Sequence, residues 1–364
     1  MSLSGRSHHL PPTLLKTDGD KGLYGGFDDI HRMIPPWNRP ILVTGTHRSG
    51  STWVGRMIAS HWRVKYYSEP LNPESPGCPA RQYFHYVTEA DEPRFLAYLK
   101  PIIQLKALTL KETADPFCII RFAGKLGKLA GRFMRRGFGG RPLLKDPMAL
   151  LSAEWLARRY QSDTIVLIRH PAAFASSLKR LNWHFPFGDF LSQQQLMEDF
   201  LEPFRKDIER FARTPPDIVT QAILLWRILH GMILRYRLKH PEWTFVRHED
   251  LSARPHEEFA KLFRALGLGF SARAYRTIAE YTDGDNPVEA AEGAVHQLKR
   301  DSLGNIWNWT QRLNRDEVLR IRRGTEEVAR HFYSAADWSP PIPVTRKVIS
   351  SRPRLVLDGL RAVS

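Results

Sequence analysis

The stretch Ile41-Leu-Val-Thr-Gly-Thr-His-Arg-Ser-Gly-Ser-Thr-Trp53 predicts a phosphate-binding loop between a buried strand and a helix. Its first residues are apolar or β-branched, its centre is bounded by Gly45 and Gly50, and an apolar helical pattern begins at Trp53. A strand, a glycine turn and a helix N-terminus bring free backbone N–H groups together, which favours anion binding. The glycine spacing is that of a Walker A loop, but Ser51 stands in place of the lysine. The sequence therefore indicates a phosphorylated ligand other than Mg-ATP.

A second junction of this kind follows at Thr164-Ile-Val-Leu-Ile-Arg169. The apolar run predicts a buried strand, and the next helix carries Ser177. An arginine at the carboxyl end of a parallel strand points into the crevice where open α/β sheets bind ligands. Arg169 would offer planar paired donors to a phosphate, and Ser177 a hydroxyl donor. A salt-bridged arginine and a helix-capping serine would explain the same residues without a ligand.

Arg48-Ser49-Gly50-Ser51-Thr52-Trp53 resembles the 5′-phosphosulfate loop of sulfotransferases that use 3′-phosphoadenosine 5′-phosphosulfate (PAPS). The resemblance implies that Arg48 and the loop's amides and hydroxyls hold the phosphosulfate, and that Trp53 packs on adenine. Arg169 with Ser177 is similar to the 3′-phosphate motif of the same family. Further matches occur in the family's order, so the resemblance extends over roughly residues 40 to 333.

The late segment Lys299-Arg300-Asp301-Ser302-Leu303-Gly304 resembles the family's loop that closes over the 3′-phosphate. The resemblance implies that Arg300 and Gly304 bind the cofactor. Asp301 and Ser302 replace the family's lysine and glycine, so their carry-over is weaker.

Sulfuryl transfer requires a positioned donor, a neutralised leaving phosphate and a base for the acceptor hydroxyl. The resemblance implies that Arg48 and the strand-end Lys145 neutralise the phosphate oxygens. Cytosolic members carry a histidine two residues after this lysine, but this chain has proline there. The segment Glu69-Pro-Leu resembles that of carbohydrate sulfotransferases, so Glu69 is the expected catalytic base. Asp146 and His47 are alternative bases, and Glu69 could instead be a surface carboxylate in a turn.

The 364 residues have an ordinary globular composition, 42% hydrophobic and 25% charged. No apolar run approaches the roughly 20 residues of a membrane span, and the N-terminus lacks a signal-peptide pattern. Two cysteines, Cys78 and Cys118, cannot build a disulfide scaffold, and no Cys/His cluster has zinc spacing. We therefore expect a cytoplasmic protein with reduced thiols, no transmembrane segment and no metal.

The formal net charge of +16 favours an anionic ligand or partner, such as nucleic acid, PAPS, or an acidic or membrane-surface acceptor. The basic residues are dispersed and form no nucleic-acid recognition motif, so we expect no nucleic-acid partner. A tetra-anionic PAPS molecule explains a cationic cleft. The stretch Arg132–Phe138 mixes bases with large apolar residues and could contact a membrane surface, or it could be a solvated helix end.

Alternating strands and helices predict an α/β fold: a three-layer, P-loop-like arrangement with a central parallel sheet flanked by helices on both faces. We expect an N-terminal extension over residues 1–38 and a sulfotransferase domain over 39–338. A helical acceptor-side insertion is expected at about 90–138 and a tail at 339–364. Oligomeric state is not predicted.

Helical patterns cover residues 148–160, 192–213 and 217–240, whereas 282–308 has the pattern of a long loop. After the Ser177 helix come Trp183, His184, Phe185, Phe187 and Phe190, which could form an acceptor platform. Aromatic faces bind sugars and lipids, but interior packing explains these side chains equally well.

These features predict an enzyme that transfers the sulfuryl group of PAPS to a hydroxyl of a carbohydrate or glycolipid, by in-line displacement with a carboxylate base. A P-loop kinase or NTPase is one alternative, which the missing loop lysine disfavours. A non-catalytic nucleotide- or polyanion-binding module is another.

Overall fold

The computed structural model describes the chain in three ranges: residues 38–105, 140–289 and 297–340. Residues 1–332 form one compact unit and residues 333–364 a second. In the second unit, the described part contains one short 3₁₀ helix, η6 (Ala335–Trp338). The predicted N-terminal extension, most of the predicted insertion with Arg132–Phe138, and nearly all of the predicted tail lie outside the described residues.

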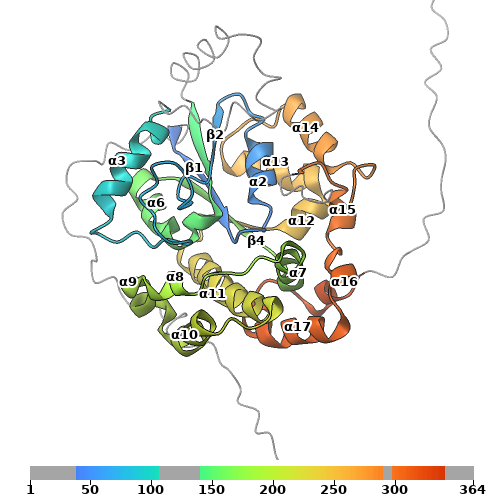
Figure 1. Ribbon diagram of the computed structural model, residues 1–364. Coiled ribbons are helices and arrows are strands. Elements are labelled where there is room, and N and C mark those ends of the chain that lie inside the picture. The colour runs from blue at the N-terminus through green and yellow to red at the C-terminus, as the bar shows by residue number, and fades with distance from the viewer. Residues whose placement is uncertain (1–37, 106–139, 290–296, 341–364) are drawn as a thin grey trace, which may run out of the picture. The chain divides into compact units, whose positions relative to one another are not determined.

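The first unit is built on five parallel strands in the order β2-β3-β1-β4-β5 (Figure 1). In that order their bounds are β2 (Val64–Ser68), β3 (Arg141–Lys145), β1 (Ile41–Gly45), β4 (Asp163–Ile168) and β5 (Thr244–Arg247). Because all strands run the same way, their carboxyl ends share one edge of the sheet, where such sheets bind ligands. The predicted parallel sheet is confirmed.

Successive side chains of a strand point to opposite faces of the sheet. Every residue of β1 and β3 is buried, so both faces of the sheet must be covered, and helices cover both. Ile41 and Val43 pack into a core with one helical layer. That layer consists of α2 (Ser51–Ile58), α12 (His248–Ala253), α13 (Pro255–Ala265) and α14 (Ala272–Thr282). The other layer contains η3 (Pro147–Ser152), α6 (Ala153–Tyr160), α7 (Pro171–Leu181), α11 (Ile218–Lys239) and α17 (Arg315–Ala329). The predicted three-layer α/β fold is confirmed; α3 (Glu92–Ile103) lies beside α6 (Figure 1).

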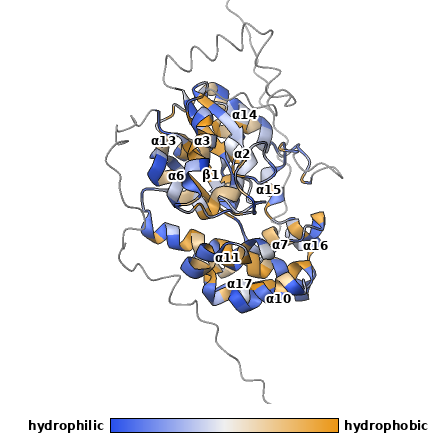
Figure 2. Ribbon diagram, turned by 60° about the vertical axis from the view of Figure 1, so that its left-hand side comes forward, coloured by the Kyte–Doolittle hydropathy of each residue, from blue (hydrophilic) through white to orange (hydrophobic). Residues whose placement is uncertain are grey.

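Of the described helices, α11 alone is long and apolar enough to cross a membrane by composition. Of its most apolar window, 72% is buried inside the protein. Figure 2 shows hydrophobic residues concentrated along this helix, which packs against α7 and α17. The position of α11 in the core therefore accounts for its apolar character.

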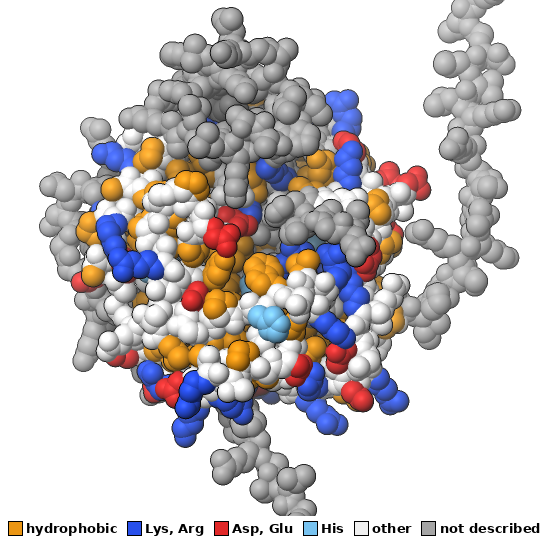
Figure 3. Space-filling model, viewed as in Figure 1, with side chains coloured by type: hydrophobic (Ala, Val, Ile, Leu, Met, Phe, Trp, Pro, Cys, Tyr) orange, Lys and Arg blue, Asp and Glu red, His pale blue; other side chains and the backbone are white. Residues whose placement is uncertain are grey.

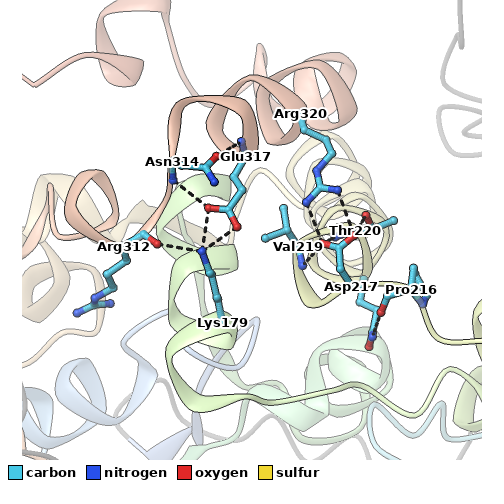
Figure 4. Close-up of polar contacts among 10 residues, drawn as sticks. Lys179, Pro216, Asp217, Val219, Thr220, Arg312, Asn314, Glu317 and Arg320 are labelled. Atoms are coloured by element: carbon cyan, nitrogen blue, oxygen red, sulfur yellow. Dashed lines mark hydrogen bonds and ion pairs between the residues drawn. The ribbon is translucent and has the colours of Figure 1, made fainter.

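Polar caps and ion pairs fix α7, α11 and α17 to one another (Figure 4). Asp217 caps α11 by accepting from the Thr220 N–H, and it also pairs with Arg320 of α17 at 2.8 Å. Asn314 and Glu317 form a capping box at the start of α17. The Nζ atom of Lys179, on α7, pairs with Glu317 at 2.7 Å and donates to the backbone oxygen of Arg312. These contacts hold the chain near Arg312 against α7.

Two helical predictions need correction. The helix expected at 148–160 begins as the 3₁₀ helix η3, whose first residue is Pro147 and whose N-cap is Asp146, with its carboxylate accepting from the Met148 N–H. The helix expected at 192–213 begins at Gln194 and changes type along its length, and Pro203, which has no N–H to donate, lies in its 3₁₀ turn. Its pieces are α9 (Gln194–Leu196), the π-helix η4 (Met197–Leu201), η5 (Glu202–Phe204) and α10 (Arg205–Arg213), and the separate short helix α8 (Gly188–Leu191) precedes them.

The segment expected to be a long loop at 282–308 also contains a helix in its described part. Residues Ser302–Asn305 form the short helix α15, and α16 (Trp309–Arg312) follows after a turn at residues 306–308. The side chain of Asp301 begins α15 by accepting from the Gly304 N–H at 3.0 Å. The aspartate that departs from the family pattern is therefore a helix cap.

Candidate active site

The loop between β1 and α2 has a backbone that only particular residues tolerate. Gly45 has a φ of 139°, and a Cβ there would lie 2.6 Å from the backbone oxygen of Leu167. Gly50 has a φ of 91°, and a Cβ there would collide with the His248 ring. Gly50 is the N-cap of α2 and no side chain caps this helix, so the N–H groups of its first turn are available to an anion.

A cleft of about 410 Å³ opens at the carboxyl edge of the sheet, beside this loop. Five arginines from separate parts of the chain line it: Arg48, Arg169, Arg180, Arg300 and Arg312. Figure 3 shows, near the centre of this face from left to right, carboxylates, hydrophobic side chains and basic side chains. The fold thus gathers guanidinium groups that the sequence disperses.

The charge of the arginine cluster is only partly balanced by carboxylates. Arg169 lies 3.7 Å from Glu249, and Arg312 pairs with Glu289 at 2.6 Å. Burial, and then the neighbouring Arg180, lower the pKa of Arg48 to about 10. Burial followed by Arg180 also lowers the pKa of Arg300. A polyanion bound among these groups would relieve their mutual repulsion.

The two phosphate motifs predicted from the sequence meet in the cleft. The Nε atom of Arg48 donates to Ser177 Oγ at 3.0 Å. The backbone of Arg169 is fixed from α11, because Trp226 Nε1 donates to its oxygen at 2.9 Å and His230 Nε2 accepts from its N–H at 3.3 Å. Clamping the backbone at the strand end directs the Arg169 side chain to the cleft, which it lines.

The remaining predicted loop residues divide into two groups. Ser51, Thr52 and Trp53 line the cleft, and Trp53 packs its ring edge-to-face against Phe259 at 5.2 Å. Ser49 is fully buried and its N–H donates to the Thr46 oxygen at 3.2 Å, closing the turn. Ser49 therefore shapes the loop rather than the cleft surface.

Glu69 and Lys145 form a pair at the end of β3. The Lys145 ammonium donates to Glu69 Oε1, while Asn72 Nδ2 donates to Oε2 at 2.9 Å. The Glu69 N–H donates to the Lys145 oxygen at 2.7 Å, and Glu69 adopts a left-handed φ of 50°. Such strained residues cluster at functional sites. Glu69 lines the cleft with 27% of its side chain exposed, whereas Lys145 is 1% exposed behind it.

The two alternative bases have environments that disfavour proton abstraction. Asp146 is fully buried, and its carboxylate accepts from the N–H groups of Leu71 and Met148. Burial raises the pKa of Asp146 to about 7, but its side chain does not line the cleft. His47 lines the cleft, and burial lowers its pKa to about 3, which makes it a weak base.

The late loop brings one of its two predicted residues to the cleft. Arg300 lines the cleft, and Ser302 fixes the loop by donating to the Ser252 oxygen at 2.9 Å. Gly304 does not line the cleft; a Cβ there would lie 2.5 Å from the Asp301 carboxylate. Close packing against the helix cap accounts for this glycine.

Among the residues of the cleft wall that sequence reasoning missed are Arg180, Arg312 and His248. Arg180 lies three residues after Ser177 on α7, so helical spacing could have placed both on one face. Its Nε atom is buried with no hydrogen-bond partner among the described residues. No sequence signal marks Arg312, which reaches the cleft through α16, or His248, which packs on Gly50.

The predicted aromatic platform is divided between the cleft and the core. Trp183 lines the cleft and is 37% exposed. Phe187 and Phe190 are buried, and Phe185 packs on both, at 5.2 and 4.9 Å between ring centroids. Interior packing therefore explains the last two aromatics.

Within the described ranges, no three His, Cys, Asp or Glu side chains lie close enough together to hold a metal ion. Cys78 is a free thiol there, and Cys118 lies outside the described residues. The polar groups that line the cleft are mainly guanidinium, hydroxyl and backbone donors, and such donors suit an anion.

The chain matches the model of the sulfotransferase family over residues 40–272, and it belongs to that family. No curated protein matches it significantly.

Among solved structures, the chain is similar to the sulfotransferase domain from the Synechococcus PCC 7002 olefin synthase, at 18% identity and a TM-score of 0.44, over 81% of this chain and 95% of that one. The sulfotransferase domain from the curacin biosynthetic pathway is 15% identical, with a TM-score of 0.40 over 78% and 96%. Sulfotransferase STF9 from Mycobacterium avium is 14% identical, with a TM-score of 0.40 over 82% and 77%.

Proposed function

We propose that this sulfotransferase takes its sulfuryl group from PAPS and transfers it to a hydroxyl of a carbohydrate or glycolipid. One observation carries the proposal. Five arginines line one cleft together with the N-terminus of α2, and Glu69, held by the buried Lys145, lies in the wall of the same cleft. The cytoplasmic location expected from the sequence stays a prediction.

The residues present fit a bisphosphorylated nucleotide. Arg48 loses basicity among its neighbours, and Arg180 keeps a buried Nε donor without a hydrogen-bond partner among the described residues. Arg169, Ser177 and Arg300 would hold the 3′-phosphate, as the family resemblance implies. Arg180 is close to both Arg48 and Arg300: of all charged groups, it lowers the pKa of each of these two arginines the most.

The 5′ side would be held by the loop between β1 and α2. The uncapped first turn of α2 supplies backbone donors, and Ser51 and Thr52 supply hydroxyls beside them. Trp53 presents its indole at the cleft, where it would pack on adenine.

When bound, PAPS supplies a sulfur atom that the acceptor oxygen attacks while the bond from sulfur to the phosphate oxygen breaks. Glu69 would accept the acceptor's hydroxyl proton on a carboxylate oxygen and release it to water after turnover. Arg48 would neutralise negative charge that develops on the leaving phosphate. Lys145, which was expected to share this role, is buried behind Glu69 and does not line the cleft, so its ammonium acts on the Glu69 carboxylate instead. Asn72 and Lys145 hold the Glu69 carboxylate in place meanwhile.

The test is transfer of radiolabel from sulfur-labelled PAPS, in EDTA, to a panel of neutral glycosides and glycolipids. We expect labelled acceptor with the wild-type protein and background label with Arg169→Ala. Arg210→Ala removes an exposed arginine of α10 outside the cleft and serves as the matched control. Phosphorylation of the same acceptors from ATP, without sulfuryl transfer, would contradict the proposal.

A further inference from the structure

The wall of the cleft beside Glu69 is a tightly hydrogen-bonded turn, residues 69–75. The Asn72 N–H donates to the Glu69 oxygen at 3.1 Å, and the Ser75 N–H donates to the Asn72 oxygen at 2.8 Å. Ser75 Oγ also donates to the Glu69 oxygen at 2.7 Å. These bonds fix the positions from which Glu69, Asn72 and Glu74 line the cleft.

The Asn72 carboxamide links Glu69 to Glu74. Its Nδ2 atom donates to Glu69 Oε2 at 2.9 Å, and its Oδ1 atom accepts from the Glu74 N–H at 3.0 Å. The backbone of Glu74 therefore lies one carboxamide group away from the carboxylate of Glu69. Since both glutamates line the same cleft, a molecule the size of a sugar ring that reacts at Glu69 can also contact Glu74.

Tyr83 lies beside Glu74 in the same cleft wall. Its N–H donates to Asp189 at 2.8 Å, and its hydroxyl donates to Glu74 Oε1 at 2.5 Å. The hydrogen bond to Glu74, then burial, and then the charges of Glu74, Asp189 and Glu69 raise the pKa of Tyr83 to about 12. Tyr83 is therefore protonated at neutral pH, and it donates its hydroxyl hydrogen to Glu74.

The side chains of Glu74 and Tyr83 offer hydrogen-bond acceptors to a ligand. Glu74 Oε2 has no hydrogen-bond partner within the described ranges, and the Tyr83 oxygen keeps its lone pairs when its hydrogen is donated. Such atoms suit a ligand group that donates a hydrogen, such as a hydroxyl, and do not suit an ether oxygen or a methylene. A cationic donor is disfavoured, because five arginines line the same cleft.

We infer that Glu74 and Tyr83 bind a second hydroxyl of the acceptor, close to the hydroxyl that reacts at Glu69, and so select polyols over simple alcohols. The inference rests on the proposed function, because Glu69 defines where the acceptor reacts. Glu74 and Tyr83 contact no reacting atom in this arrangement. Their loss should therefore raise KM for the acceptor and leave kcat nearly unchanged.

The test measures sulfuryl transfer from labelled PAPS to methyl glucoside and to its monodeoxy analogues, after binding of 3′-phosphoadenosine 5′-phosphate (PAP) has been checked by calorimetry. The analogue that lacks the reacting hydroxyl should receive no label. Another analogue, deoxygenated nearby, should show a KM raised about 10- to 100-fold, the effect of losing a hydrogen bond to a charged group, with kcat within about threefold. KM values within about twofold for every sulfated analogue would overturn the inference.

Variants assign this discrimination to the Glu74–Tyr83 pair. Glu74→Ala should raise KM for methyl glucoside about 10- to 100-fold and make it equal to that of the sensitive analogue, because the same contact is then absent from both. Tyr83→Phe, which keeps the ring, should raise KM about 3- to 10-fold. Glu89→Ala removes an exposed carboxylate outside the cleft and should change neither KM. Undiminished discrimination by Glu74→Ala would contradict the assignment.

The same experiment distinguishes the two levels of the account. If the wild-type protein fails to bind PAP, the proposed function itself is wrong. If it binds PAP and either sulfates the analogues without discrimination or transfers no label to methyl glucoside, the inferred recognition of a second hydroxyl is wrong.

Discussion

Glu69 is the residue on which the proposed chemistry depends most. It is partly exposed to the cleft, while Lys145 and Asn72 fix its two carboxylate oxygens. A left-handed backbone at a non-glycine residue costs free energy, and the surrounding hydrogen bonds maintain it. This arrangement holds the Glu69 carboxylate at the cleft wall, where the proposed acceptor hydroxyl would lie.

We expect Glu69→Gln to bind PAP with wild-type affinity and to lose turnover by a factor of about 10² to 10⁴, the usual contribution of a positioned base. Parallel measurements of kcat and of PAP affinity check this. Glu74→Gln, which removes the other carboxylate of the cleft wall, should keep kcat within about threefold. Normal turnover in Glu69→Gln would assign the base elsewhere.

Arg180 is the residue whose role could not be found in a motif. Its guanidinium is the strongest charged neighbour of both Arg48 and Arg300. We expect Arg180→Ala to weaken PAP binding by about 10- to 100-fold, the effect of losing a charge-assisted hydrogen bond. Binding of AMP, which lacks the 3′-phosphate, should change by less than about threefold. Equal losses for the two nucleotides would place Arg180 away from the 3′-phosphate.

At the scale of elements, the junctions of strand and helix position the cleft. The turn after β1 depends on glycines at two crowded positions, and the late loop is fixed by a cap and a buried serine. The contacts of α7 with α17 also position the cleft wall, because Lys179 of α7 binds both Glu317 and the backbone oxygen of Arg312, whose side chain lines the cleft (Figure 4).

A substitution in the capping box of α17 tests whether these contacts stabilise the fold. Asn314→Ala should lower the free energy of unfolding by about 1 kcal/mol, because the Glu317 N–H loses its side-chain acceptor. Asn314→Asp keeps an acceptor and should stay within about 0.5 kcal/mol of wild type. Urea unfolding of the three proteins provides the measurement. Equal free energies of unfolding for Asn314→Ala and wild type would show that the cap does not stabilise the protein.

The elements that carry a strong local pattern were predictable from the sequence. The β1 loop, the strand ending at Arg169 and the helix beginning after Asp217 agree with expectation, because apolar periodicity and caps act locally. The changes of helix type within 192–213 were not, since that prediction rested on the helical pattern alone. The assembly of the arginine cluster also escaped prediction, because Arg312 and Arg180 meet the loop only through tertiary packing.

At the scale of the whole molecule, buried histidines couple stability to pH. His230 is fully buried against Trp226, and burial lowers its pKa from 6.5 to about 3. Between these two pH values the unfolded chain binds a proton that the folded protein does not. The free energy of unfolding therefore decreases as the pH falls from 6.5 toward 3.

We expect His230→Gln to reduce the slope of the unfolding free energy against pH by up to about 1.4 kcal/mol per pH unit in this window. Glutamine can still accept from the Arg169 N–H without titrating. Urea unfolding of both proteins between pH 4 and 8 would give the two slopes. Identical slopes below pH 6 would show that His230 does not couple folding to protonation.

Binding of the nucleotide tests the central claim most directly. The measurement is a calorimetric titration of the full chain with PAP in EDTA, with ATP titrated under the same conditions. The account predicts micromolar binding of PAP and at least about 100-fold weaker binding of ATP, because only PAP offers a 3′-phosphate to Arg169, Arg180 and Arg300. Absence of PAP binding, or equally tight binding of ATP, would contradict the account.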